Sequence, residues 1–216
     1  MDLCHLAVEK NVRAFMNIVA ETCRMLDVEV LLGEGDRVEY DGLYSNGYFG
    51  NISLLSVRYA VAVGKPVSLW LPVALHEFCH LEQWAEGAPV WTDQEFSKTT
   101  CAFDLVMEWC GGKDLPKEEV TRLVRLAREL ERDCEERALR KITQFELPLD
   151  PLEYAQKANS YLFFCTAMIE TKQWYVHAPY EVPEVWTLMP TVLLPAGDYD
   201  TLPGEYLEVF KKHLFA

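Results

Sequence analysis

The chain has 216 residues, half of them apolar and 12% aromatic, so it can bury a real core and is not expected to be disordered. Its formal net charge of −14, with no basic run, argues against nonspecific nucleic-acid binding. The apolar stretches are too short to cross a bilayer and no charged-then-apolar leader is seen. We therefore expect a soluble, cytoplasmic protein with reduced cysteines that does not bind membranes.

The first third of the chain predicts one helix followed by short strands. Helical spacing of apolar residues predicts a helix from about Cys4 to Leu26. Short strands are expected at Val28 to Leu32 and Val38 to Tyr40, split by the glycine-rich turn at 33–36. Residues alternate in polarity from Leu55 to Val63, which predicts a strand packed on one face.

The next segment carries the sequence His-Glu-Phe-Cys-His at 76–80, inside an apolar helix that should end at Gly87. Residues four apart share one helix face, so His76 and His80 can direct ring nitrogens at one metal ion. Glu77 sits about 100° round the helix and could reach a water on that metal without being a ligand. Pro72 is expected in the first turn, where helices tolerate proline. Histidines on apolar helices are often core residues, but this context favours zinc.

The remainder of the chain is predicted to be mainly helical. Helices are expected over four segments, Thr92 to Cys110, Leu115 to Ile142, Asp150 to Lys172 and Tyr206 to Phe215. Thr92 and Glu95 would form the capping box of the first. The tail after Trp174 is rich in proline and should be irregular before the last helix. The fold class predicted is therefore α+β, mainly helical, as a single domain over residues 1–216.

A zinc ion held by two histidines needs a third protein ligand, and the Leu115 to Ile142 helix supplies the best candidate. Its apolar residues form one stripe at about 100° per residue: Val120, Leu123, Val124, Ala127, Leu130, Cys134, Ala138 and Ile142. Glu131 falls inside this stripe, where a carboxylate is costly unless it is paired or binds a metal. Glu135, at the stripe's edge, could accept a hydrogen bond from the outer nitrogen of a ligating histidine. The predicted metal ligands are His76, His80 and Glu131.

Other arrangements remain open at this point. Metzincins take a ligand six residues after the second histidine, here Glu86, but they need a glycine where this chain has Gln83. A continuing helix would also carry Glu86 about 9 Å along the axis from His80. His177 could be a ligand in principle, although a surface position is expected. In a third alternative the chain is a helical scaffold without metal, and a basic side chain neutralises Glu131.

The HExxH motif at 76–80, followed by the ExxCE pattern at 131–135, resembles the gluzincin arrangement, in which a second helix supplies a glutamate ligand. The order of motifs is similar to that of ImmA/IrrE-type domains and, more closely, of small uncharacterised HExxH proteins of tailed phages. The resemblance implies a zincin-like fold, with the active-site helix on a small sheet, Zn²⁺ as cofactor and a peptide or protein as substrate. It also implies a substrate edge at Leu55 to Val63, with an interior strand as the alternative.

The predicted function is zinc-dependent hydrolysis of peptide bonds, with Glu77 as general base, in the cytoplasm of a host if the chain is phage-encoded. The alternative is a zinc-binding regulatory or interaction module with little or no hydrolytic activity, whose acidic surface would suit a basic partner. Glu77 favours the enzyme, because a structural site has no use for a general base. Residues that could donate a hydrogen bond to the transition state are Tyr161, Tyr175, His177 and Tyr180, and none is assigned. The sequence leaves the oligomeric state open.

Overall fold

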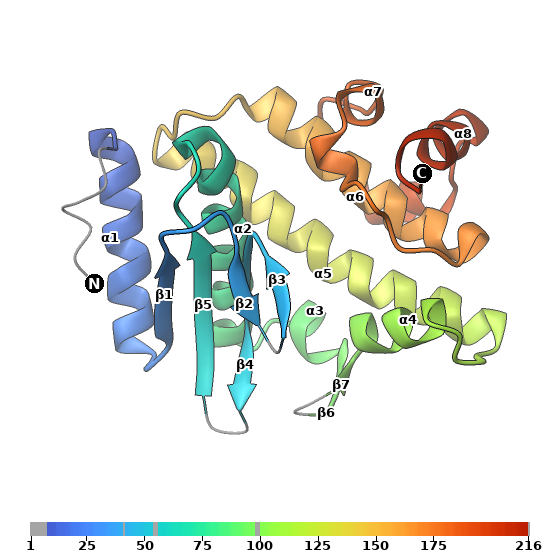
Figure 1. The fold of residues 1–216 in the computed structure, drawn as a ribbon, viewed down its shortest axis with the longest axis horizontal. Coiled ribbons are helices and arrows are strands. Elements are labelled where there is room, and N and C mark those ends of the chain that lie inside the picture. Colours follow the sequence, from blue (N-terminus) through green and yellow to red (C-terminus); the bar gives the residue numbers. More distant parts are fainter. Residues whose placement is uncertain (1–7, 41, 54–55, 98–99, 216) are drawn as a thin grey trace. The chain divides into compact units, whose positions relative to one another are not determined.

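The structure is a computed structural model that describes residues 8–40, 42–53, 56–97 and 100–215. The fold is α+β and mainly helical, which confirms the fold class predicted from the sequence (Figure 1). The chain divides into two compact units, Met1–Ala88 with Arg137–Leu149, and Pro89–Glu136 with Asp150–Ala216. The single domain expected over residues 1–216 stays a prediction.

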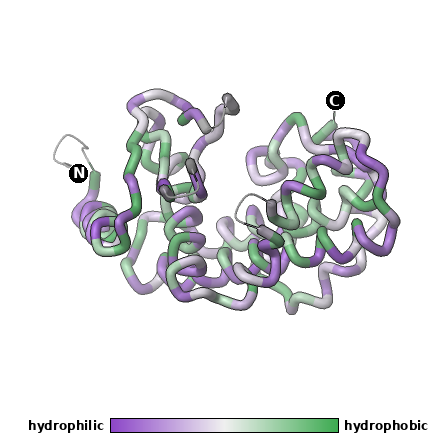
Figure 2. The backbone as a smooth tube through the Cα atoms, turned by 90° about the horizontal axis from the view of Figure 1, so that it is seen from below, coloured by the Kyte–Doolittle hydropathy of each residue, from purple (hydrophilic) through white to green (hydrophobic). Residues whose placement is uncertain are grey.

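Hydrophobic and hydrophilic residues alternate at short intervals along the chain (Figure 2). In keeping with this pattern, the part of the chain that the structure describes contains no helix with the length and apolarity to span a membrane. The six cysteines within the described residues are free, as the sequence predicted for the thiols.

The first unit contains helical segments, a small three-stranded sheet and a separate pair of strands, β2 and β3. Its elements are α1 (Lys10–Met25), β1 (Glu29–Gly33), β2 (Val38–Tyr40), β3 (Leu43–Ser45), β4 (Gly47–Ser53), β5 (Ser56–Ala62) and α2 (Val67–Glu86). Helix α1 begins later than predicted, because Glu9 is the N-cap residue in an extended conformation. The predicted start at Cys4 lies outside the described residues. Phe15 of α1 contacts Phe78 of α2 edge-to-face, with ring centroids 5.6 Å apart.

Strand β5 is the middle strand of a three-stranded sheet in the order β1-β5-β4. It runs parallel to β1 and antiparallel to β4, and its residues Tyr59 to Ala62 are buried. The prediction that Leu55 to Val63 is a substrate edge is therefore wrong, and the alternative of an interior strand is confirmed. Leu55 itself lies outside the described residues. Strands β3 and β4 were not predicted, and β4 is the terminal strand on one side.

Helix α2, which carries the HExxH motif, packs on β4 and β5 (Figure 1). The buried hydroxyl of Tyr59 donates a hydrogen bond to the carbonyl of Ala74, 2.8 Å away, and so ties β5 to the turn before the motif. The helix begins at Val67, so Pro72 is its sixth residue and lies in the second turn, which corrects the predicted position. Gly87 ends the helix in the left-handed conformation, with φ 59°, as expected.

Gly47, the first residue of β4, lies where the sheet approaches α2 closely. A Cβ atom there would lie 2.6 Å from Cγ1 of Val73 and 2.8 Å from the carbonyl oxygen of Ala60. We expect Gly47→Ala to destabilise the protein by about 1–3 kcal/mol, because the strand must move away from the helix. Gly197→Ala is the matched control, since no atom lies within 4 Å of its Cβ position. Equal melting temperatures of the two variants would contradict this close packing.

The second unit is almost entirely helical. Its elements are α3 (Pro89–Thr92), β6 (Glu95–Ser97), β7 (Thr100–Cys101), α4 (Ala102–Cys110), α5 (Lys117–Gln144, up to Glu136), α6 (Pro151–Thr171), η1 (Pro179–Glu181), α7 (Pro183–Trp186), η2 (Ala196–Asp200) and α8 (Gly204–His213). The predicted capping box of Thr92 and Glu95 is wrong, because Glu95 pairs with Cys101 in a two-stranded ladder. Asp104 caps α4 instead, accepting a hydrogen bond of 2.8 Å from the backbone N–H of Cys101.

Helices α5 and α6 follow the sequence-based expectation closely. All eight apolar residues of the predicted α5 stripe are buried. Helix α6 begins after Asp150, whose carboxylate accepts a hydrogen bond of 2.9 Å from the backbone N–H of Leu152, and ends before Lys172. Buried polar groups fix the proline-rich tail: Arg128 of α5 donates to Thr166 and to the carbonyl of Tyr199, at 2.7 and 2.8 Å.

Candidate metal site

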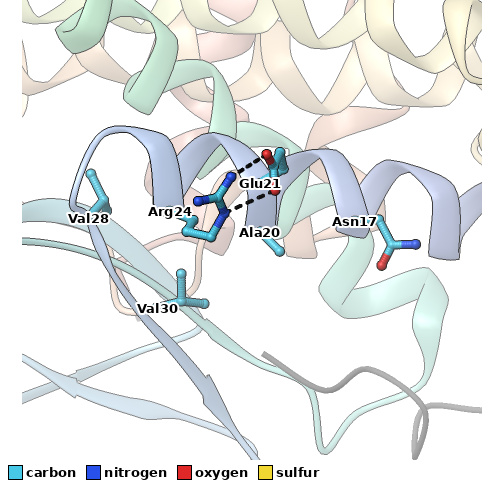
Figure 3. Close-up of a pocket in the computed structure, with 6 residues that line it drawn as sticks. All are labelled: Asn17, Ala20, Glu21, Arg24, Val28 and Val30. Atoms are coloured by element: carbon cyan, nitrogen blue, oxygen red, sulfur yellow. Dashed lines mark hydrogen bonds and ion pairs between the residues drawn. The ribbon is translucent and has the colours of Figure 1, made fainter.

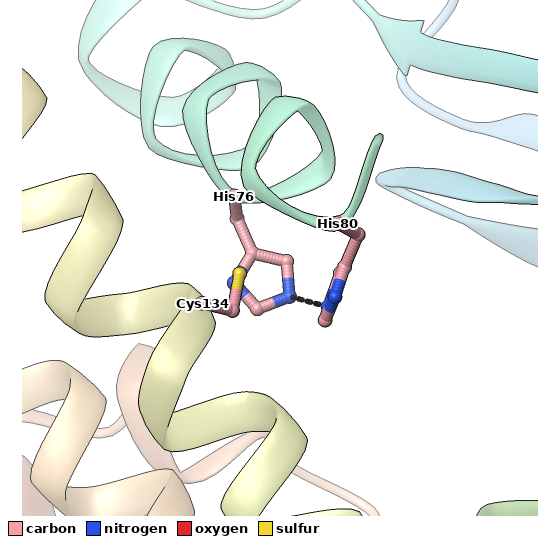
Figure 4. Close-up of side chains that lie close together, drawn as sticks. All are labelled: His76, His80 and Cys134. Carbon is pink, nitrogen blue, oxygen red and sulfur yellow. Dashed lines mark hydrogen bonds between the residues drawn. The ribbon is translucent and has the colours of Figure 1, made fainter. Parts of the chain in front are cut away.

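The imidazole rings of His76 and His80, both on α2, meet through their outermost nitrogen atoms. The Nε2 atoms of His76 and His80 lie 3.0 Å apart, and the ring planes are nearly perpendicular, at 88° (Figure 4). Two nitrogen ligands at 2.0–2.1 Å from a tetrahedral zinc ion lie roughly 3.3 Å from each other. The observed separation therefore needs to change by only a few tenths of an ångström for both nitrogens to bind one ion.

Cys134 of α5 completes the group. Within the described residues, the ligand-type atoms of His76, His80 and Cys134 all lie within 4.8 Å of one another, so that the three could hold a metal ion (Figure 4). Cys134 is fully buried and His80 is 7% exposed. Two imidazole nitrogens and one thiolate are donors that zinc accepts in proteins. Sequence reasoning treated Cys134 only as a small packing residue.

Ion pairs join the end of α5 to α2 within the first unit. Arg137 pairs with Glu86 of α2 at 2.9 Å. One turn further along α5, Lys141 pairs with Glu82 of α2 at 2.6 Å. Both pairs lie in the part of α5 that belongs to the first unit, Arg137–Leu149.

Gln83 contacts the outer nitrogen of His80. Its Oε1 atom lies 2.8 Å from Nδ1 of His80, and the side chain of Gln83 is completely buried. Sequence reasoning missed this contact and used Gln83 only as an argument against the metzincin pattern. The available signal was its spacing, because residues three apart on a helix are neighbours. The sequence analysis predicts Glu135, and not Gln83, as the acceptor of a hydrogen bond from the outer nitrogen of a ligating histidine.

Glu77 lies on the sheet side of α2. It is buried, with 9% of its surface exposed, and a Cβ atom on Gly47 would lie 3.4 Å from its Cγ atom. The carbon stem of Glu77 therefore packs beside the first residue of β4. Burial raises the pKa of Tyr59 on the neighbouring strand, and the charge of Glu77 acts in the same direction. Glu77 is not part of the three-residue ligand group.

The carboxylate of Glu131 is not a member of the ligand group within the described residues. It lies close enough to α6 to act on two of its side chains. Burial raises the pKa of Tyr161, and the charge of Glu131 adds to the effect. The same two causes raise the pKa of the Cys165 thiol. Ligation by Glu131 stays a prediction.

Glu135 is buried, and its charge affects the pKa of Tyr199 in the second unit. Burial raises the pKa of Tyr199, and the charge of Glu135 is one of the smaller contributions in the same direction. The predicted hydrogen bond from Glu135 to a ligating histidine stays a prediction.

The alternative ligands considered from the sequence lie elsewhere. Glu86 is 56% exposed and pairs with Arg137, as described above, and it does not join the ligand group. His177 is exposed. No second group of three metal-ligand side chains is found in the described ranges.

The tyrosines considered as hydrogen-bond donors belong to an aromatic cluster of the second unit. The rings of Tyr161 and Tyr180 meet edge-to-face at 6.2 Å, and the ring of Phe164 lies 5.1 Å from that of Tyr175. Burial raises the pKa of Tyr175, and a hydrogen bond with Tyr180 raises it further. The three tyrosine rings thus pack within this cluster, and their role as hydrogen-bond donors stays a prediction.

A separate hollow of about 650 Å³ lies between α1 and β1 (Figure 3). Its lining residues are Asn17, Ala20, Glu21, Arg24, Val28 and Val30. The two charged side chains, Glu21 and Arg24, form an exposed ion pair of 2.6 Å with each other. The hollow therefore presents neither a metal-ligand group nor an uncompensated charge of its own.

Comparison of the chain with protein families, with curated proteins and with solved structures finds no match.

Proposed function

We propose that the protein is a zinc-dependent hydrolase of peptide bonds, with His76, His80 and Cys134 as zinc ligands and Glu77 as general base. The observation that carries the proposal is the meeting of two histidine Nε2 atoms, 3.0 Å apart, with a buried thiol in one group. Three protein ligands are the number that catalytic zinc sites use, because the fourth tetrahedral position is kept for water or substrate.

The role of Glu77 follows from its place beside the ligand pair. A zinc ion bound in this group would lower the pKa of a bound water to about 7. The Glu77 carboxylate would accept a proton from the attacking water and deliver it to the leaving amine nitrogen. The carbon stem of Glu77 packs against Gly47 of β4, and this contact positions the carboxylate on the side of α2 that faces the sheet.

A peptide is the substrate class that the neighbouring sheet supports. Strand β4 ends the three-stranded sheet and packs against α2 at the position of Glu77. Extended peptides commonly bind by adding a strand to the edge of a sheet, which fixes the peptide backbone in register. A peptide bound along β4 would present its bonds close to the general base. The zincin-like character of the fold belongs to this proposal.

One observation favours the second candidate, a zinc-binding interaction module. Cysteine ligands and deep burial are typical of structural zinc sites, and Cys134 is completely buried. Structural sites, however, use four protein ligands, whereas the group contains three side chains among the described residues. The acidic chain, with a net charge of −14, would then bind a basic partner.

The two candidates differ in what the zinc-loaded protein does to peptides. We expect an unbiased peptide library to yield new amino termini, detected by mass spectrometry, only when the protein carries zinc. The control is the same preparation after removal of zinc with a chelator and dialysis. Retention of one zinc ion per chain without any cleavage would contradict the hydrolase and support the interaction module.

A further inference from the structure

Gln83 is an amide placed where a helix normally buries apolar groups. It lies on α2 among buried residues, three positions after His80, and its own surface is entirely buried. Burying an amide without a hydrogen bond costs free energy, so the position demands a specific contact. The contact is made by its Oε1 atom, 2.8 Å from Nδ1 of His80.

The chemistry of this contact determines the tautomer of His80. An amide oxygen has no hydrogen to donate, so the proton between the two atoms belongs to Nδ1 of His80. A neutral imidazole has only one N–H group, and Nε2 therefore keeps its lone pair. Nε2 is the atom that lies 3.0 Å from Nε2 of His76. The contact thus prepares the nitrogen that faces the ligand group.

We propose that Gln83 is a positioning residue of the metal site, which holds His80 in the Nδ1–H tautomer and fixes its ring plane before any ion binds. The inference rests on the metal site of the proposed function but not on hydrolysis. Hydrogen bonds to the outer nitrogen of a ligating histidine commonly change metal affinity 10–100-fold.

The use of a neutral amide has a further consequence. A carboxylate at position 83 would also accept the Nδ1 hydrogen bond, but it would add a negative charge close to a cation already bound by one thiolate. The amide orients the ring without that charge, so more of the positive charge of the ion remains to act on a bound water. Gln83→Glu should therefore preserve metal binding, whereas a side chain without an acceptor oxygen should not.

The test compares Gln83→Met, which keeps length and loses the amide, with Gln83→Glu, which keeps an acceptor. Gln94→Met is the matched control, because Gln94 is also a buried glutamine and lies outside the ligand group. The dissociation constant for zinc alone is measured by competition with a chelating dye. We expect it to rise about 10–100-fold in Gln83→Met and to change less than about threefold in the other two variants.

A second readout separates positioning from general packing. Two-bond ¹⁵N–¹H correlation spectra of the metal-free proteins report which nitrogen of His80 carries the proton. We expect the Nδ1–H form in the wild type, in Gln83→Glu and in Gln94→Met, and its loss in Gln83→Met. The inference is overturned if His80 of the wild type is the Nε2–H tautomer, or if Gln83→Met binds zinc as tightly as the wild type. Should Gln83→Met fail to fold, the wild-type and Gln83→Glu spectra decide the matter.

The outcomes distinguish this inference from the proposed function. Zinc binding that depends on Gln83, without peptide cleavage, would remove the hydrolase and leave the positioning role in place. If Gln83→Met changes neither the rate of peptide cleavage nor the affinity for zinc, the positioning role is wrong and the hydrolase proposal stands.

Discussion

Replacing Glu77 with glutamine is expected to lower the rate of peptide hydrolysis about 10²–10⁴-fold while leaving zinc bound. The amide has the shape of the carboxylate but cannot accept the proton of the attacking water. Zinc should be retained because Glu77 is not part of the ligand group of His76, His80 and Cys134. The measurements are the initial rate on a cleaved peptide and the zinc content by elemental analysis.

Glu108→Gln serves as the control for this variant. It makes the same chemical change on α4, where Glu108 is exposed and pairs with Lys113 at 2.6 Å. We expect wild-type rate and wild-type zinc content from the control. A Glu77→Gln protein with the wild-type rate would remove Glu77 from the mechanism, and loss of zinc from that variant would make Glu77 a ligand instead of a base.

The second large effect that we expect comes from zinc binding, which should raise the free energy of unfolding of the protein. An ion that binds only the folded chain adds about 2.7 kcal/mol to the free energy of unfolding when its free concentration is 100 times the dissociation constant. For a chain of this size, that corresponds to a rise in melting temperature of roughly 5–11 °C. His76→Ala and Cys134→Ser should each remove most of the rise, which calorimetry with and without zinc can measure.

The identity of the third ligand can be settled in the same set of proteins with cobalt in place of zinc. A thiolate bound to Co²⁺ gives a charge-transfer absorption in the near ultraviolet that nitrogen and oxygen ligands do not give. We expect this band in the wild type and in Glu131→Gln, and its loss in Cys134→Ser. Absence of the band in the wild type, with metal lost from Glu131→Gln, would return the role of ligand to the glutamate predicted from the sequence.

Regular periodicity accounts for the parts of the fold that the sequence predicts well. The α5 stripe from Val120 to Ile142 is buried as expected, because a long helix without glycine or proline has few alternatives. The boundaries of α6 follow from a capping aspartate, Asp150, and a proline directly after it. The histidine pair is predicted because residues four apart on a helix must share a face.

The incorrect predictions concern positions decided by contacts distant in sequence or by competing local pairings. Residues 95–97 pair with β7, and this ladder displaces the start of the predicted helix to Ala102. The interior place of β5 depends on its parallel partner β1, which no local pattern reveals. The role of Gln83 is marked in the sequence only by its spacing of three residues from His80, and that spacing alone does not distinguish it from the other helical neighbours of the histidine.

The third ligand illustrates the limit of helical periodicity. Glu131 and Cys134 lie one turn apart in the same stripe of α5, so both can face the core by spacing alone. The cost of burying a carboxylate made Glu131 the residue that required an explanation. Only the coordinates distinguish the two, and within the described residues it is Cys134 that joins the histidines in the ligand group.

Both the hydrolase and the positioning role of Gln83 require that His76 and His80 bind one divalent ion together. Anomalous diffraction of zinc-loaded crystals, recorded on both sides of the zinc absorption edge, tests it directly. We expect a single peak at about 2.0–2.1 Å from the Nε2 atoms of both histidines. Zinc-loaded crystals with no peak between these two rings, or with the zinc peak at another place in the chain, would contradict it.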